Sequence, residues 1–143
     1  MKVSQISVFL ENKSGRLADV TRTLAQNKIN IRALSIADTI DYGLLRMIVN
    51  DPVLATRVLA DEGFTVAQTE VLAIEVPDRP GGLAGIIDML AARGLNIEYM
   101  YAFVGRSGEH AIVIFRIDPV DEAIEALRGG GARILTGDEL HAL

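Results

Sequence analysis

Two stretches of the sequence decide the fold: SGRLADVTRTLAQNKINI at residues 14–31 and PGGLAGIIDMLAARGLNI at residues 80–97. They align without a gap, and seven of the eighteen pairs are identical. Average residue usage predicts roughly one identity in such a comparison. Two copies are too few for a solenoid, which needs about three repeats or more. The chain of 143 residues therefore contains a duplicated unit of roughly half its length.

Hydrophobic periodicity predicts the same elements in both halves. Alternating apolar residues predict a first strand at residues 6–10 and again at 71–76. Apolar residues spaced three and four apart predict a helix in each copy. The stripes are Leu17, Val20 and Leu24 in the first copy, and Leu83, Ile86 or Ile87, and Leu90 in the second. A strand pair around a short turn follows each helix, at residues 29–39 and 44–49 and at residues 95–104 and 111–117.

A second helix and a closing strand complete each unit. Pro52 and Pro119 suit the first turn of a helix, and Asp51 and Asp118 before them are expected N-caps. Closing strands are expected at residues 64–66 and 132–135. The order βαββαβ, found twice, predicts an α+β protein of two tandem ferredoxin-like units, each a four-stranded antiparallel sheet with two helices on one face. We expect these domains at residues 1–69 and 70–143, without a flexible linker between them.

Composition limits the classes of function. Fourteen Lys and Arg against nineteen Asp and Glu give a net charge of -5, which disfavours nucleic acid and anionic membranes as partners. The chain has no cysteine, which excludes thiolate catalysis, disulfides and Cys-ligated metal sites. No stretch approaches the roughly 20 apolar residues of a membrane helix. We therefore expect a cytoplasmic protein.

The strand-to-helix loops resemble those of the ACT domain, a small regulatory ligand-binding module. In the second half, Asp78-Arg79-Pro80-Gly81-Gly82-Leu83 fits the family pattern of Asn or Asp, any residue, Pro, Gly, any residue, Leu, and Leu95-Asn96-Ile97 opens the next strand. The first half has Asn12-Lys13-Ser14-Gly15-Arg16-Leu17 and Ile29-Asn30-Ile31, with Ser14 where the family often has Pro. The resemblance covers nearly the whole chain and implies the ferredoxin-like fold.

The resemblance also implies a small amino acid as ligand, bound at an interface between two units by the loop of one and the following strand of the other. A helix N-terminus presents unpaired N–H groups to a carboxylate, and Asp or Asn side chains complement an α-amino group. The implied ligand-binding residues are Asn12, Ser14, Gly15, Arg16, Leu17, Asn30, Asp78, Arg79, Gly81, Gly82, Leu83 and Asn96. Each also has a structural interpretation, as turn, helix start or core, and duplication copies structural residues as faithfully as binding residues.

No catalytic, metal or cofactor site is expected. The run Gly81-Gly82-Leu83-Ala84-Gly85 lacks the G-x-G-x-x-G spacing of a dinucleotide site. His110 and His141 lack the spacing of metal ligands, and the sequence has no G-x-S-x-G motif whose serine a histidine could activate. The expected strands lack the aromatic platforms and basic surround of an RNA-recognition domain. Enzyme activity is therefore not expected.

The sequence predicts a regulatory protein that senses an amino acid between its two ACT-like domains. The ligand shifts the population of domain arrangements, and no catalytic group is required. The expected partners are a small amino acid, a second copy in a homodimer and a separate regulated enzyme, with no nucleic acid or membrane. The alternative is a non-enzymatic assembly module that binds no ligand.

Overall fold

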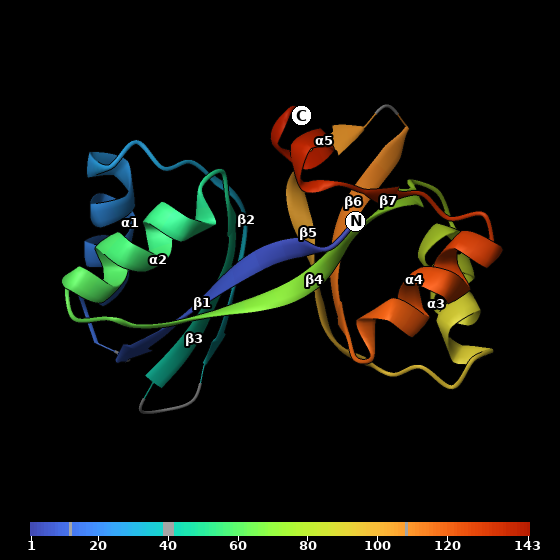
Figure 1. Cartoon of the computed structure of the whole chain (residues 1–143), viewed down its shortest axis with the longest axis horizontal. Coiled ribbons are helices and arrows are strands. Elements are labelled where there is room, and N and C mark those ends of the chain that lie inside the picture. Colours follow the sequence, from blue (N-terminus) through green and yellow to red (C-terminus); the bar gives the residue numbers. More distant parts are fainter. Residues whose placement is uncertain (12, 39–41, 108) are drawn as a thin grey trace. The chain divides into compact units, whose positions relative to one another are not determined.

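The computed structural model describes residues 1–11, 13–38, 42–107 and 109–143. The chain divides into two compact units. The N-terminal unit is Ser4–Thr69, and the C-terminal unit is Glu70–Leu143 together with Met1–Val3. Figure 1 shows the order of their elements along the chain.

The N-terminal unit is built on an antiparallel sheet. Its elements are β1 (Val3–Glu11), α1 (Arg16–Gln26), β2 (Ile31–Asp38), β3 (Tyr42–Val49), α2 (Pro52–Asp61) and the start of β4 (Thr65–Pro77). β3 lies between β1 and β2 and is antiparallel to both. β1 also pairs with β4, and the hydroxyl of Ser4 donates to Oε1 of Gln68 at 3.0 Å. The order of elements predicted for this unit, β1-α1-β2 followed by β3-α2-β4, is therefore present.

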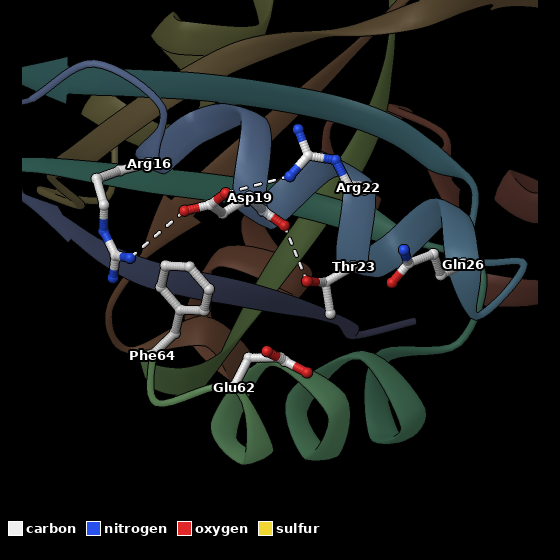
Figure 2. Close-up of a pocket in the computed structure, with 7 residues that line it drawn as sticks. All are labelled: Arg16, Asp19, Arg22, Thr23, Gln26, Glu62 and Phe64. Atoms are coloured by element: carbon white, nitrogen blue, oxygen red, sulfur yellow. Dashed lines mark hydrogen bonds and ion pairs between the residues drawn. The ribbon is translucent and has the colours of Figure 1, made fainter.

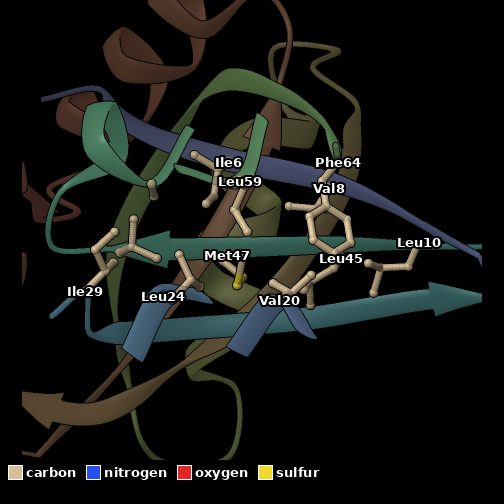
Figure 3. Packing of buried hydrophobic residues seen from close by; sticks show 12 residues of the cluster. Ile6, Val8, Leu10, Val20, Leu24, Ile29, Leu45, Met47, Leu59 and Phe64 are labelled. Atoms are coloured by element: carbon tan, nitrogen blue, oxygen red, sulfur yellow. The ribbon is translucent and has the colours of Figure 1, made fainter. Parts of the chain in front are cut away.

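One hydrophobic cluster joins the sheet to both helices of this unit. Alternate residues of β1 and β3 pack against Val20 and Leu24 of α1 and against Leu59 of α2, and all of these are buried (Figure 3). The predicted stripe of α1 is therefore confirmed at its second and third positions. Leu17, the first position, keeps 40% of its surface exposed and is not part of the core.

The C-terminal unit repeats this order. After β4 come α3 (Gly82–Ala91), β5 (Ile97–Ser107), β6 (His110–Ile117), α4 (Val120–Gly129), β7 (Ile134–Leu135) and α5 (Gly137–His141). β6 pairs antiparallel with β5 and β4, and β7 pairs antiparallel with β4. The core combines Ile86 and Leu90 of α3, Leu127 of α4 and alternate residues of β4 and β6.

The joint between the units is a strand. β4 is continuous from Thr65 to Pro77, so it closes the N-terminal unit and opens the C-terminal unit. Thr69 and Glu70, the polar pair that marks the joint in the sequence, lie inside this strand. The joint predicted from the sequence is thus strand in the structure.

Two local features differ from the sequence prediction. Asp51 caps α2 by accepting from the N–H of Leu54 at 3.0 Å, as predicted, but Asp118 does not cap α4. The N-cap there is Pro119, in an extended conformation and without a side-chain cap, so the helix begins one residue later than expected. The C-terminal tail also forms a helix, α5, which begins with a capping box between Thr136 and Glu139.

Candidate functional site

A left-handed glycine precedes the first helix of each unit. Gly15 has φ 93° and Gly81 has φ 84°, a backbone conformation that L side chains rarely adopt. Glycine offers no side chain to cap the helix that follows. No side chain therefore caps the N–H groups of the first turns of α1 and α3 that follow the first helical residue.

The two loops share one hydrogen-bond pattern. The N–H of Arg79 donates to the carbonyl of Pro77 at 2.9 Å, and the N–H of Lys13 donates to the carbonyl of Glu11 at 2.8 Å. The next bond is from Gly82 to Arg79 at 3.0 Å in the C-terminal loop. Its counterpart in the N-terminal loop runs from Arg16 to Lys13 at 3.4 Å. The two helix starts thus share a hydrogen-bond pattern, and the second bond is longer in the N-terminal loop.

The first residue of the helix differs between the loops. A Cβ on Gly82 would lie 1.9 Å from the carbonyl oxygen of Pro77, so no side chain fits at this position of α3. The matching position of α1 is Arg16, whose side chain is 30% exposed. Its guanidinium carbon lies 4.6 Å from the centroid of the Phe64 ring. The N-terminal loop therefore carries a cation where the C-terminal loop carries no side chain.

A hollow of about 470 Å³ opens at the C-terminal loop. It is lined by the end of β4, the loop, α3 and β6, through Val76, Pro77, Asp78, Arg79, Pro80, Leu83, Ala111 and Val113. Val76 is directly opposite Ala111 in the β4–β6 register. Leu83 and Val113 pack against the core of the unit. The hollow therefore lies at the edge of the apolar core and opens to solvent, and the strand-to-helix loop beside it carries the charged residues Asp78 and Arg79.

The charged residues of this hollow suit a zwitterion. Asp78 and Arg79 are consecutive and exposed, and the N–H of Asp78 donates to the carbonyl of Glu109 at 3.1 Å, which ties the loop to the start of β6. Within the described part of the chain, no ion pair engages the Arg79 guanidinium. An ammonium group pairs with a carboxylate and a carboxylate with a guanidinium, so this pair of residues is able to bind both ends of an α-amino acid.

A different hollow in the N-terminal unit lies between the end of β1 and the start of β4 and carries charged groups on its walls. It measures about 220 Å³ and is lined by Phe9, Leu10, Glu11, Arg16, Tyr42, Gly63, Phe64 and Thr65. Nζ of Lys13 lies 2.9 Å from Oε2 of Glu11. The hydrogen bond and the positive charge of Lys13 hold the pKa of Glu11 below its usual value. The counterpart of Glu11 in the C-terminal loop is Pro77, which has no charge.

Arg16 also borders a second hollow, of about 310 Å³, between α1 and the end of α2 (Figure 2). Nη1 of Arg16 lies 3.5 Å from Oδ2 of Asp19, and Nη1 of Arg22 lies 3.3 Å from Oδ1 of the same carboxylate. Figure 2 shows Arg16 beside the Phe64 ring, with Asp19 between the two arginines. The cation is therefore held between a ring and a carboxylate of its own unit.

The structure brings some of the predicted site residues together. Asp78, Arg79 and Leu83 line the C-terminal hollow, while Gly81 and Gly82 shape its loop without lining it. In the N-terminal unit Arg16 lines a hollow, and Ser14, Gly15 and Leu17 are exposed. Asn12 lies outside the described residues.

The two asparagines stand away from the loops of their own units. Asn30 and Asn96 are exposed and follow the C-terminal ends of α1 and α3, whereas the loops precede these helices. A helix of ten residues is about 15 Å long, so helix and loop geometry separates each asparagine from its own glycine. The N–H of Asn30 donates to Oδ1 of Asn50 at 2.9 Å, which anchors the start of β2 to the end of β3.

Several lining residues were not among those predicted from the sequence: Val76, Pro77, Pro80, Ala111 and Val113. The alternation that places Val76 in line with Leu72 and Ile74 was a usable signal, because it puts the side chain on the helix-facing side. The two β6 residues become neighbours of the loop only through the strand register, which periodicity does not give.

Neither a metal cluster nor a membrane span is found in the described ranges. No group of three or more His, Cys, Asp or Glu there is arranged to hold a metal ion. No helix among the described residues is both long and apolar enough to cross a bilayer.

The repeated βαββαβ order and the two matching loops define a protein built from a duplicated α+β module. A family model described as an ACT domain pair matches residues 1–140. The chain therefore belongs to the ACT domain pair family, and the resemblance seen in its loop motifs is confirmed.

Solved structures agree with this assignment. A crystal structure of a Bacteroides thetaiotaomicron protein is 43% identical, with a TM-score of 0.93, and the match covers 100% of this chain and 98% of that one. The ligand-free regulatory subunit of aspartate kinase from Thermus thermophilus is 19% identical, with a TM-score of 0.61 and coverage of 89% and 91%. Aspartate kinase from Synechocystis is 20% identical, with a TM-score of 0.59, and this chain matches 25% of its length. At these identities the two kinase structures show a shared fold alone. A comparison with curated protein sequences finds no match.

Proposed function

We propose that this chain is a regulatory protein that binds a small α-amino acid at the Asp78–Leu83 loop of its C-terminal unit. The observation that carries the proposal is the hollow of about 470 Å³ at this loop, where adjacent charges of opposite sign meet apolar walls. Small-molecule sites commonly combine such walls with a few convergent polar groups. Membership of the ACT domain pair family supports the same assignment.

The loop offers a partner for each polar group of the ligand. The guanidinium of Arg79 and the uncapped first turn of α3 bind the α-carboxylate, because both present N–H donors and positive charge. The carboxylate of Asp78 binds the α-ammonium group. The glycines of the loop allow the ligand to approach the backbone closely. No proton transfer or covalent step is needed, so the proposed role is sensing and not catalysis.

The remaining features of the proposal come from the sequence. We propose two ferredoxin-like domains, at residues 1–69 and 70–143. The ligand bridges the Gly81 loop of one domain and the Asn30 strand of the other, and the Gly15 loop and the Asn96 strand form the reciprocal pair. The strand order within each unit supports the ferredoxin-like arrangement. Ligand binding would then favour one relative arrangement of the domains and report it to a partner.

The proposed partner is a separate enzyme, and the proposed assembly is a homodimer. The similar Thermus thermophilus protein is a regulatory subunit of aspartate kinase, which supports a regulatory role without identifying the enzyme regulated here. A cytoplasmic location stays a prediction from the sequence.

Thermal unfolding with each of the twenty amino acids at millimolar concentration tests the proposal. A ligand at about 100 times its Kd stabilises a protein by about 2.7 kcal/mol, which in a chain of this size raises Tm by roughly 5–10 °C. Asp78→Asn is expected to remove most of this shift. Asp88→Asn is the matched control, because Asp88 is exposed on α3 and does not line the hollow. If no amino acid shifts Tm, the assembly module without a ligand becomes the better account.

A further inference from the structure

We propose that the amino acid bound at the C-terminal loop carries a branched aliphatic side chain, as in valine, leucine or isoleucine. This inference rests on the proposed function, since it names the class of ligand for the same site. It follows from the distribution of apolar and charged residues around the hollow.

The apolar walls come from three different elements of the C-terminal unit. Val76 is the second-last residue of β4 and is only 4% exposed. Leu83 lies in the first turn of α3, and Ala111 and Val113 lie on β6. Leu83 and Val113 already pack against the core of the unit. An aliphatic group placed here extends that core and removes apolar surface from water on both sides of the contact.

The same walls disfavour a polar ligand side chain. None of these four wall side chains carries a hydrogen-bonding atom, and the backbones of β4 and β6 are paired with each other at Val76 and Ala111. A hydroxyl, amide or ammonium group buried against them would lose its water without gaining a partner. The charged groups of the hollow are confined to the consecutive residues Asp78 and Arg79, which the α-amino and α-carboxylate groups of the ligand engage.

Titration calorimetry of the full chain with a panel of L-amino acids tests this inference. Valine and threonine are the sharpest pair, because they have the same shape and differ by one hydroxyl group. We expect valine to bind at least about tenfold more tightly than threonine, and serine, lysine and aspartate to bind more weakly still. Leucine and isoleucine belong to the expected binding class.

Two variants locate the side-chain pocket. Ala111→Leu fills the hollow and is expected to weaken binding of the aliphatic ligand at least about tenfold. Ala91→Leu is the control, because it adds the same group to an exposed position at the C-terminal end of α3, which does not line the hollow. Val113→Thr is a second variant that is nearly isosteric, so it still tests the pocket if Ala111→Leu does not fold. It is expected to narrow the preference for valine over threonine, since it adds a polar partner to the wall.

The outcomes separate this inference from the proposed function. Preferential binding of a charged or hydroxylated amino acid overturns the aliphatic class while leaving the sensing role intact. Aliphatic binding that Ala111→Leu and Val113→Thr leave unchanged overturns the assignment to this hollow. Absence of binding by every amino acid overturns the proposed function itself.

Discussion

The two strand-to-helix loops of this chain share a left-handed glycine and a hydrogen-bond pattern, and they differ in their side chains. Gly15 and Gly81 adopt the same left-handed conformation, and both loops make the same sequence of backbone hydrogen bonds. The C-terminal loop lines a hollow of about 470 Å³ through Asp78, Arg79 and Pro80, whereas at the N-terminal helix start Arg16 packs on Phe64 and pairs with Asp19. Duplication has therefore preserved the geometry that starts a helix while allowing the chemistry beside it to diverge.

The difference centres on the first residue of each helix. Gly82 approaches the carbonyl of Pro77 so closely that a Cβ would lie 1.9 Å from it. Arg16, at the matching position, stacks on Phe64 and pairs with Asp19. The C-terminal helix start thus carries no side chain at this position, and the N-terminal one carries a cation that is engaged within its own unit. We expect the two units to have different roles, with ligand binding at the C-terminal loop.

The largest expected effect is that of Gly82→Ala. The new Cβ meets a backbone carbonyl that no side-chain rotation relieves, so we expect a loss of about 2–3 kcal/mol in the free energy of unfolding. Urea denaturation measures it. Gly85→Ala is the control, because a Cβ at Gly85 meets nothing within 4 Å and alanine favours the helix by about 0.5–1 kcal/mol. Equal stability of the two variants would contradict the close contact on which the comparison depends.

A smaller effect is expected from Arg16→Ala in the other loop. The change removes the stacking of the guanidinium on Phe64 and a partly exposed ion pair with Asp19, together about 1 kcal/mol of unfolding free energy. Arg22→Ala removes an ion pair to the same carboxylate without a ring contact, and we expect it to cost less than about 0.5 kcal/mol.

Arg16→Ala also tests whether the two loops differ in function. Its affinity for the amino acid should equal that of the unaltered protein, because Arg16 does not line the C-terminal hollow. A loss of binding in this variant, with the fold intact, would move the site to the N-terminal loop.

The smallest expected effect is a pH dependence confined to the N-terminal loop. The hydrogen bond and charge of Lys13 lower the pKa of Glu11, so the folded state favours the carboxylate. The resulting stabilisation is present near neutral pH and is lost as the pH falls through this lowered pKa. Glu11→Gln should therefore change Tm little overall and should flatten its acid dependence between about pH 7 and about pH 3. A Tm difference from the unaltered protein that is constant over this range would contradict the pairing.

Much of the fold follows from sequence periodicity. The 66-residue shift between Gly15 and Gly81 identified the repeat, and the stripes through Leu24 and Leu90 identified the helices that cover the two cores. Prediction from local patterns succeeds here because each helix and strand buries one face, so its apolar residues recur with the period of that element. The end of the chain was missed, since α5 is five residues long and depends on the capping box at Thr136.

The candidate site was less accessible to sequence reasoning. The loop motif identified Asp78, Arg79 and Leu83, but Ala111 and Val113 are neighbours of this loop only because of the β4–β6 register. Leu17 and Leu83 are identical in the alignment, yet Leu17 is 40% exposed and Leu83 packs against the core. An identical residue in the two copies therefore indicates common ancestry and does not show that the two residues make the same contacts. The surroundings in each unit decide what the residue contacts.

The most direct test of the central claim is a map of backbone amide chemical shifts in the ¹⁵N-labelled chain during titration with L-valine or L-leucine. The account predicts the largest changes at residues 78–83 and 111–113, with the N-terminal loop at residues 13–17 little affected. Changes centred on residues 13–17, or a spectrum that no amino acid alters, would contradict it.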